Sequence, residues 1–321
     1  MRRLLIASLA VLLAGCGTPS FLITPVQNTS AMVETEVQPG KGGGKVAVIE
    51  VEGMLMNAKT GSFLQAGENP LSVFTQQLEQ AERDKSVKAV VLRVNSPGGT
   101  VTTSDAMYEE LMRFRNKTHK PVVASCQEVC ASGAYYVSCA ADRIMAQPTT
   151  VVGSIGVIFN TFNLTGTLNK IGASADAIKS GPLKDMGSPF KPMTVQERDV
   201  MQGIVNDYYA RFVGVVTTNR HITDEATLKT CTDGRVFPGD RAREIGLVDD
   251  LGLLEDAIDA ARKMGNAPGA KAVMYKRPYG YKGSIYAETS VPQPQASNNV
   301  TKLELPGGPW LPSGFYYLWN P

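Results

Sequence analysis

The sequence predicts an α/β fold with a largely parallel sheet core and flanking helices. Runs of β-branched residues alternate with amphipathic segments of helical length, and this alternation is typical of crossover units in a parallel sheet. A chain of 321 residues can bury one substantial core or two modest ones. An apolar fraction of 43%, a charged fraction of 19% and a formal net charge of +2 are ordinary for a globular protein. The sequence has no basic block or aromatic stacking motif, so we expect no nucleic-acid partner.

The first half of the chain supplies the alternating elements. A β-branched run at 46–51 predicts a strand that Gly53 ends. Residues 70–83 place Leu71, Phe74 and Leu78 on one helical face. The elements expected next are, in order, a strand at 89–94, a helix at about 104–116, a strand at 121–124, a helix opening at Ser132 and a short strand beginning at 144.

The second half is predicted to be more helical. Thr194 with Glu197 three residues later forms a capping-box pattern, and an apolar stripe from Met201 to Val215 follows it. This stripe indicates a packing face rather than a functional surface. Leu254, Ile258 and Ala261 then predict a last amphipathic helix.

The N-terminus has the pattern of an export signal. Arg2 and Arg3 precede an apolar stretch at 4–13 that is too short to span a bilayer. Leu13-Ala14-Gly15-Cys16 is similar to the lipobox of bacterial lipoproteins, in which the mature chain begins at the cysteine and carries lipid on it. An ordinary secretory signal or an uncleaved anchor is the alternative. The expected location is the bacterial cell envelope, with a lipid-anchored protein facing the periplasm or the exterior.

Four segments are therefore expected. They are a signal peptide at 1–15, a flexible tether at 16–45, a folded domain at 46–290 and a Pro-rich tail at 291–321. The tail includes a stretch from Trp310 to Trp319, and we expect it to dock on protein in preference to a lipid interface. The cysteines at 126, 130, 139 and 231 permit up to two disulfides outside the cytoplasm, and buried free thiols are the alternative. Their spacing does not match a zinc site, and no metal is expected.

Two short motifs supply candidate chemistry. Asn95-Ser96-Pro97-Gly98-Gly99 follows a strand and predicts a glycine turn whose backbone N–H groups face a ligand. Ala131-Ser132-Gly133 sets a serine at a strand-to-helix junction. A serine nucleophile and backbone N–H groups for an oxyanion are what acyl transfer requires, so the pattern favours a serine peptidase.

A serine nucleophile also needs a base. Histidine is the usual one, but His119 and His221 both lie in polar contexts that are typical of surface residues. A lysine can replace histidine, because desolvation favours its neutral amine. The segment 178–185 offers Lys179 and Lys184, although composition alone makes neither a strong candidate.

Five motifs in order resemble the signal peptide peptidase A (protease IV) family across about residues 46–265. They are Asn95 to Gly99, Ala131 to Tyr136, Gly153-Ser154-Ile155-Gly156, Lys179 to Asp185, and Asp233 to Phe237. The resemblance implies a Clp-protease/crotonase-like fold and a serine–lysine dyad. In it Ser132 is the nucleophile, Lys184 the general base and Ser154 the residue that orients the lysine. It also implies an oxyanion hole from the N–H groups of Gly133 and of the Gly98–Gly99 pair.

The resemblance further implies a function and partners. The expected activity is hydrolysis of peptides by a serine endopeptidase, including cleaved signal peptides and other membrane-associated peptides. It implies no cofactor. It also implies a ring-like homo-oligomer in which Lys184 can serve the Ser132 of a neighbouring chain. The alternatives are a crotonase-type acyl-CoA enzyme, a histidine-dependent Clp-like protease, and a scaffold or binding lipoprotein of the same fold without catalysis.

Overall fold

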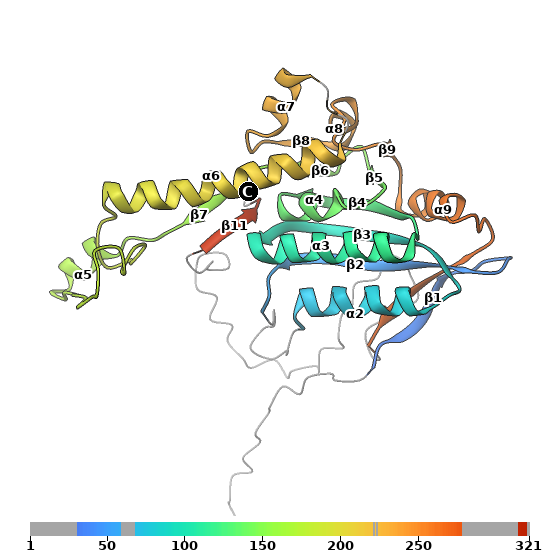
Figure 1. Ribbon diagram of the computed structural model, residues 1–321, viewed down its shortest axis with the longest axis horizontal. Helices are drawn as coiled ribbons and strands as arrows, with labels where there is room; N and C mark the ends of the chain where they lie inside the picture. Colours follow the sequence, from blue (N-terminus) through green and yellow to red (C-terminus); the bar gives the residue numbers. More distant parts are fainter. Residues whose placement is uncertain (1–30, 59–67, 221, 223, 278–313, 320–321) are drawn as a thin grey trace, which may run out of the picture.

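A computed structural model describes residues 31–58, 68–220, 222, 224–277 and 314–319 (Figure 1). Its centre is a mostly parallel sheet with the strand order β1-β10-β2-β3-β4-β5-β9. These strands are β1 (Val33–Gln38), β2 (Lys45–Leu55), β3 (Val87–Thr100), β4 (Val122–Ala131), β5 (Arg143–Ala146), β9 (Asp250–Leu251) and β10 (Lys271–Lys276). The pairings from β10 to β9 along this order are parallel, and only the edge strand β1 runs antiparallel to its neighbour. The predicted α/β class with a largely parallel core is confirmed.

Shorter strands extend the sheet at the carboxyl ends of β3 and β4. They are β6 (Val151–Gly153), β7 (Ile158–Asn160), β8 (Val236–Pro238) and β11 (Gly314–Leu318). Strand β6 continues the parallel pairing of β4, while β11 lies antiparallel to β3 and to β7. Parallel strands end at the same edge of a sheet, so these additions gather around the motifs that follow β3 and β4.

Helices cover both faces of the sheet. The helices in the described ranges are α2 (Pro70–Arg83), α3 (Val101–Thr118), α4 (Gly133–Ser138), α5 (Thr165–Lys170), α6 (Val195–Asn219), α7 (Glu225–Cys231), α8 (Gly239–Glu244) and α9 (Leu254–Met264), and of these α5 projects away from the sheet. One core lies between the sheet and α2, α3 and α4, and it includes Phe74, Leu111 and Tyr136. The second core lies on the opposite face beneath α9, around Leu254 and Ile258. Successive side chains of a strand point to opposite faces, so β2 and β3 contribute to both cores.

Local sequence signals set the helix boundaries. Asn69 caps α2 by accepting hydrogen bonds from the N–H groups of Leu71 and Ser72, and Pro70 occupies the first turn, where its missing N–H costs nothing. The predicted capping box at α6 is confirmed: Thr194 accepts from the N–H of Glu197, and the Glu197 carboxylate accepts from the N–H of Thr194.

The structure differs from two local expectations in β2 and β3. Strand β2 does not end at Gly53. That residue adopts a φ of 63°, and the register shifts between Glu52 and Met54 as the strand continues. The expected glycine turn at 95–99 is wrong, because these residues pair with β2 and carry β3 to Thr100, although Gly98 has a φ of 97°. This segment pairs with β2 and β11, and the two strands provide hydrogen-bond partners for its backbone N–H and C=O groups.

The ends of the folded part also differ from the expectation. Residues 33–38, inside the segment expected to be a tether, form β1 and pair with β10. The C-terminal segment 314–319 docks on the domain, as expected for the stretch ending at Trp319. The signal-peptide pattern and Cys16 lie outside the described residues. In the described ranges, no helix is both long and apolar enough to cross a membrane.

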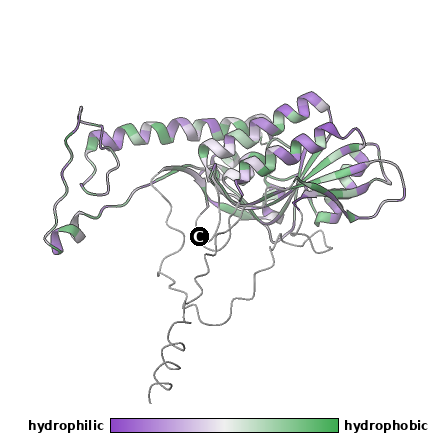
Figure 2. Ribbon diagram, turned by 90° about the horizontal axis from the view of Figure 1, so that it is seen from below, coloured by the Kyte–Doolittle hydropathy of each residue, from purple (hydrophilic) through white to green (hydrophobic). Residues whose placement is uncertain are grey.

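One region projects from the body. Strand β7, helix α5, the loop at 171–194 and the first half of α6 extend away from the sheet in both views (Figures 1 and 2). The second half of α6 packs on the body through Phe212 and Val216, whereas Val195 and Val200 in its first half are exposed. We call residues 157–205 the projecting arm.

Candidate active site

Ser132 lies at the junction between β4 and α4. Its backbone has φ 54° and ψ −118°, a conformation that L-residues rarely adopt and that a surrounding fold must enforce. Its N–H donates a 2.7 Å hydrogen bond to the carbonyl of Gly153, which fixes the junction to β6. The side chain is only 1% exposed, and its Oγ has no hydrogen-bond partner within the described structure. Buried hydroxyls are normally satisfied, so an unpartnered one at a strained position indicates a functional group.

Helix α4 holds Ser132 rigidly from the other side. All six of its residues are buried. The Tyr135 hydroxyl donates to the Leu247 carbonyl at 2.7 Å, and the Tyr136 hydroxyl donates to the Asp105 carboxylate at 2.6 Å. Arg211 of α6 contacts the same carboxylate through two nitrogens, at 2.8 and 3.0 Å. The helix after the serine is therefore tied to α3, α6 and the chain before β9.

Three glycines converge beside this junction. A Cβ built on Gly98, where φ is 97°, would lie 2.6 Å from the Gly133 nitrogen. A Cβ built on Gly133 would lie 3.2 Å from the Gly99 nitrogen and 2.2 Å from the Ser104 Oγ. Gly99 has no room either, because its Cβ would meet the Leu55 carbonyl oxygen at 1.9 Å. Backbone N–H groups that approach this closely, next to a serine, suit the stabilisation of an oxyanion.

Ser154 lies next to Ser132 through strand pairing. Ala131 of β4 is paired with Gly153 of β6, so the residues that follow them are neighbours. Ser154 has a φ of 52° and is 7% exposed, and its N–H donates to the Arg235 carbonyl at 2.8 Å. The Arg235 carbonyl, in the motif at 233–237 just before β8, thus holds the backbone of Ser154.

Lys184 is not beside Ser132 in this chain. It is exposed on the projecting arm, and within the described ranges its amine makes no hydrogen bond or ion pair. The adjacent Asp185 pairs instead with Lys179 at 2.7 Å and with Lys191 at 3.4 Å. The hydrogen bond from Lys179 lowers the pKa of Asp185. The structure therefore brings together Ser132, Ser154, Gly98, Gly99 and Gly133, and leaves Lys184 apart from them.

The histidine nearest to the site in sequence is also remote. His119 is an exposed residue that ends α3 and lies before β4 begins, whereas Ser132 follows the last residue of β4. The ten residues of β4 separate them, which is about 30 Å at the usual rise of a strand. His221 lies outside the described residues.

The cysteines at 126, 130, 139 and 231 are free and buried, so they form no disulfide in this structure. Cys130 lies two residues before Ser132, and its Sγ is 3.3 Å from the Ser138 Oγ. Burial raises the pKa of Cys139 to about 12 and that of Cys126 well above its usual value. The thiols of Cys126 and Cys139 are therefore protonated, and both residues serve as small core residues.

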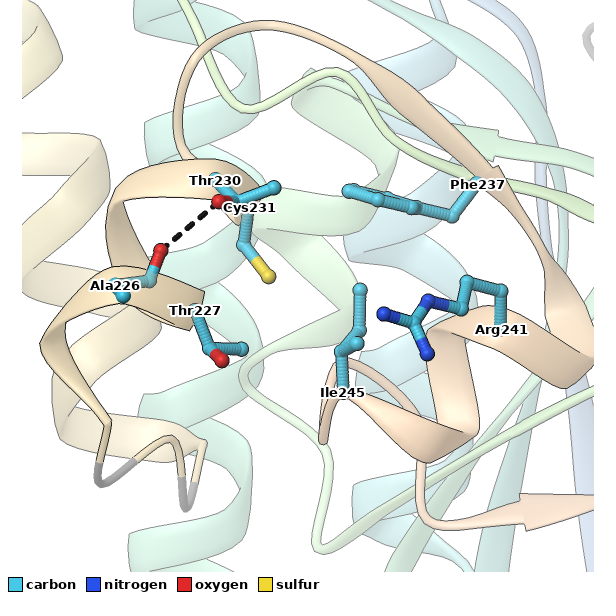
Figure 3. Close-up of a pocket in the computed structure, with 7 residues that line it drawn as sticks. All are labelled: Ala226, Thr227, Thr230, Cys231, Phe237, Arg241 and Ile245. Atoms are coloured by element: carbon cyan, nitrogen blue, oxygen red, sulfur yellow. Dashed lines mark hydrogen bonds between the residues drawn. The ribbon is translucent and has the colours of Figure 1, made fainter.

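A small pocket lies away from this site, between α7, β8 and α8 (Figure 3). Cys231 lies on one side of the pocket, and Phe237 and Arg241 lie on the other. The Thr230 hydroxyl is engaged with the Ala226 carbonyl at 2.9 Å. None of the candidate catalytic residues lines this pocket.

Several residues that support the site lie outside the sequence motifs. Asp105 and Arg211, which hold Tyr136, come from two separate helices, and no local motif links them. Tyr317 of β11 packs on Tyr136 with a ring separation of 5.2 Å. For Tyr317, the sequence feature that could have indicated a place in the site was the cluster of aromatic residues in an otherwise Pro-rich tail.

The fold and this site define a class, a Clp-protease-like α/β domain with a serine at a strained strand-to-helix junction and a glycine cradle formed by Gly98, Gly99 and Gly133 beside it. A family model for Clp protease matches residues 48–152, and a model for peptidase family S49 matches residues 114–267. The chain belongs to peptidase family S49, the signal peptide peptidase A family.

Three relatives illustrate this membership. The chain is 35% identical over 248 residues to a putative signal peptide peptidase SppA of Enterococcus faecium, covering 77% of this chain and 72% of the relative. It is 40% identical over 198 residues to a putative protease of Methanocaldococcus jannaschii, covering 62% of this chain and 63% of that one. It is 36% identical over 226 residues to protease 4 of Salmonella typhi, covering 70% of this chain and 35% of that longer protein.

Proposed function

We propose that this protein is a serine endopeptidase in which Ser132 is the nucleophile and Lys184 of a neighbouring copy is the general base. The observation that carries the proposal is the Ser132 Oγ itself, which is buried and unpartnered at a strained strand-to-helix junction beside three glycines. The family membership supports the reaction class, and the position of Lys184 on the projecting arm is the reason for assigning it to another copy.

The proposed reaction conserves atoms and protons. The Ser132 Oγ attacks the carbonyl carbon of the peptide bond, and its proton passes to the neutral Lys184 amine. The N–H groups of Gly133 and of the Gly98–Gly99 pair donate to the oxygen that becomes negative. Collapse expels the amine of the leaving peptide, which takes the proton from Lys184. Water, deprotonated by the same amine, then attacks the acyl-enzyme, and the amine returns this proton to the Ser132 oxygen as it leaves. Ser154 orients the lysine without reacting.

Apolar residues on the projecting arm support a homo-oligomer. In the part of the chain that the structure describes, eight of the eleven exposed large apolar residues lie between 158 and 200, among them Leu164, Ile171, Ile178, Phe190 and Val195. Such a concentration of apolar side chains on an extended segment is typical of a surface that packs against another protein copy. In the proposed ring, each arm reaches its neighbour and delivers Lys184 to Ser132.

The proposed substrates are peptides released at a membrane, including cleaved signal peptides, and the similarity to a putative signal peptide peptidase of Enterococcus faecium supports this class. Lipid on Cys16 would anchor the protein to the cell envelope, with the peptidase domain facing the periplasm or the exterior. The anchor is tested by the intact mass of the mature protein from wild type and Cys16→Ala. We expect acyl chains on the wild type alone, and an unmodified wild-type mass would contradict the anchor.

Mixing two inactive variants tests the dyad and the neighbouring copy together. Ser132→Ala and Lys184→Ala should each lower peptide hydrolysis by several orders of magnitude, because the nucleophile and base act as a unit. If both are dissociated, mixed and reassembled, random mixing gives about a quarter of the sites both intact groups and restores activity. No recovery in a mixed oligomer would place both groups in one chain. Unchanged hydrolysis in Ser132→Ala would mean that Ser132 is not the nucleophile, and absence of hydrolysis by the wild-type protein would favour a scaffold or binding lipoprotein instead.

A further inference from the structure

The hydroxyl of Ser96 joins two strands beside the glycine cradle. Its Oγ donates a 2.6 Å hydrogen bond to the carbonyl of Gly53 in β2 and accepts one of 3.1 Å from the N–H of Gly98 in β3. Ser96 has no exposed surface. A serine hydroxyl has one donor hydrogen and two lone pairs, so the same oxygen makes both contacts at once. The side chain therefore connects β2 to the segment that carries Gly98 and Gly99.

This contact decides which N–H of the segment can face an oxyanion. Pro97 has no N–H, and the N–H of Gly98 is directed at Ser96. A backbone N–H has one hydrogen, so Gly98 cannot donate to a substrate oxygen while it donates to Ser96. The next N–H along the chain is that of Gly99, and a Cβ built on Gly133 would lie 3.2 Å from its nitrogen. The cradle therefore offers the N–H groups of Gly99 and Gly133 to an oxyanion.

Both partners of Ser96 have backbone conformations that need support. Gly53 has a φ of 63° where the register between β2 and β3 shifts, and Gly98 has a φ of 97°. Glycine reaches such angles freely, but it also has many other conformations available. A buried hydroxyl that bonds to both residues favours one of these conformations. The direction of the Gly99 N–H follows from the backbone angles of Gly98, so Ser96 acts on the cradle through Gly98.

We propose that Ser96 is a positioning residue of the active site, which holds Gly98 so that the N–H of Gly99 donates to the oxygen that becomes negative in the reaction. The proposal rests on the serine peptidase function proposed above and adds a residue that acts through Gly98. Its effect falls on the transition state, because the donors face a charge that the substrate carbonyl does not yet carry. Loss of the Ser96 hydroxyl should therefore lower kcat and leave KM nearly unchanged.

Ser96→Ala in the full chain tests this role. Removing an oxyanion donor outright costs roughly 100- to 1000-fold in kcat, and Ser96→Ala keeps the donor but loses its support. We expect kcat for a peptide substrate to fall about 10- to 100-fold, with KM within about twofold of wild type. Ser125→Ala is the matched control, because it removes a buried serine hydroxyl from β4 that bonds to Gln127 at 2.9 Å. We expect it to leave kcat unchanged.

A peptide boronate separates an effect on the transition state from an effect on stability. Its boron forms a tetrahedral adduct with a serine Oγ, and one of its oxygens takes the place of the oxyanion. The affinity of the boronate for Ser96→Ala should fall by the same factor as kcat. If Ser96 had only a structural role, thermal unfolding would occur at a lower temperature, but the folded protein would bind the boronate as wild type does.

Two substitutions of Gly53 test the same contact from its exposed end, even if Ser96→Ala does not fold. Gly53 is exposed, and a Cβ built on it would meet no atom within 4 Å, so a side chain has room there. Asparagine tolerates a positive φ better than β-branched valine does. Gly53→Val should displace the carbonyl to which Ser96 donates and lower kcat and boronate affinity about tenfold. Gly53→Asn should keep both within about twofold of wild type.

The outcomes separate the two proposals. If wild type hydrolyses peptides and folded Ser96→Ala keeps its kcat and boronate affinity, the positioning role is wrong and the peptidase function stands. A fall in kcat without a loss of boronate affinity, or equal kcat in Gly53→Val and Gly53→Asn, would also overturn the positioning role. If wild type neither hydrolyses peptides nor binds the boronate, the peptidase function fails, and the role of Ser96 fails with it.

Discussion

The hydroxyl of Tyr136 donates a 2.6 Å hydrogen bond to the carboxylate of Asp105, and this contact fixes the helix that begins after Ser132. Burial and the neighbouring carboxylate together raise the pKa of Tyr136 well above its usual value, so its hydroxyl remains a donor at any physiological pH. Arg211 holds the other side of Asp105. One carboxylate thus joins α3, α4 and α6 around the proposed active site.

Asp105→Ala should weaken the contacts that join α4 to α3 and α6. The change removes the acceptor of Tyr136 and leaves Arg211 with its 3.3 Å contact to Glu109. We expect a loss of about 1–3 kcal/mol in the free energy of unfolding and a fall in kcat/KM, measured by denaturant unfolding and peptide hydrolysis. Glu109→Gln is the matched control, because that exposed side chain contacts Arg211 without touching Tyr136. Equal effects of the two variants would show that the Tyr136 contact is unimportant.

Gly99→Ala should be poorly tolerated. The added methyl group would lie 1.9 Å from the Leu55 carbonyl oxygen, and neither backbone can move without disturbing the pairing of β2 with β3. We expect a loss of about 1–3 kcal/mol in stability together with loss of hydrolysis, measured by thermal unfolding and peptidase assay. Gly156→Ala is the control, since its methyl group would meet only Gly234 at an ordinary 3.5 Å. A stable and active Gly99→Ala would mean that the cradle is looser than described.

The Arg220–Asp249 pair should contribute to stability in a pH-dependent way. Burial raises the pKa of Asp249, but hydrogen bonds from Arg220 and from the Ile144 N–H outweigh burial and lower it overall. A lowered folded-state pKa stabilises the fold above the unfolded value of 3.8, and this contribution is lost as the pH falls below that value.

Asp249→Asn should therefore destabilise the protein by about 1–3 kcal/mol at pH 7, and the difference from wild type should shrink below about pH 4. Urea unfolding of both proteins between pH 3 and pH 7 measures this (about 1 kcal/mol is resolvable). Asp259→Asn is the control, because its pair with Arg262 is solvent-exposed on the aspartate side. If the difference in stability between wild type and Asp249→Asn stays constant down to pH 3, the Asp249 carboxylate does not contribute in the pH-dependent way described.

His119→Ala should retain most peptide hydrolysis. His119 lies at the opposite end of β4 from Ser132, and its change cannot remove a base from the site. The rate in both proteins should rise with pH along one limb, because the proposed base acts as a neutral amine. The kcat/KM of wild type and His119→Ala across pH 5–10 measures this. A limb near the usual histidine value of about 6.5 that disappears in His119→Ala would replace the lysine base with a histidine.

Local patterns in the sequence determined several helices and strands and the strand-to-helix junction at Ser132. Periodicity gave α2 its bounds at Pro70 and Arg83, and the capping box fixed the start of α6, because both signals act within a few residues. The same holds for Ser132, which was predicted at a strand-to-helix junction and lies there. Only its role in a reaction remains a proposal.

The tertiary structure alone decided which distant segments meet. The glycines at 98 and 99 lie in a strand and not in a turn, because β2 and β11 pair with them from elsewhere in the chain. Tyr317 reaches the glycine cradle, and Lys184 is held away from it on the projecting arm. These placements depend on packing and strand pairing between residues far apart in sequence. Hydrophobic periodicity and motif spacing are local properties, so they do not predict such contacts.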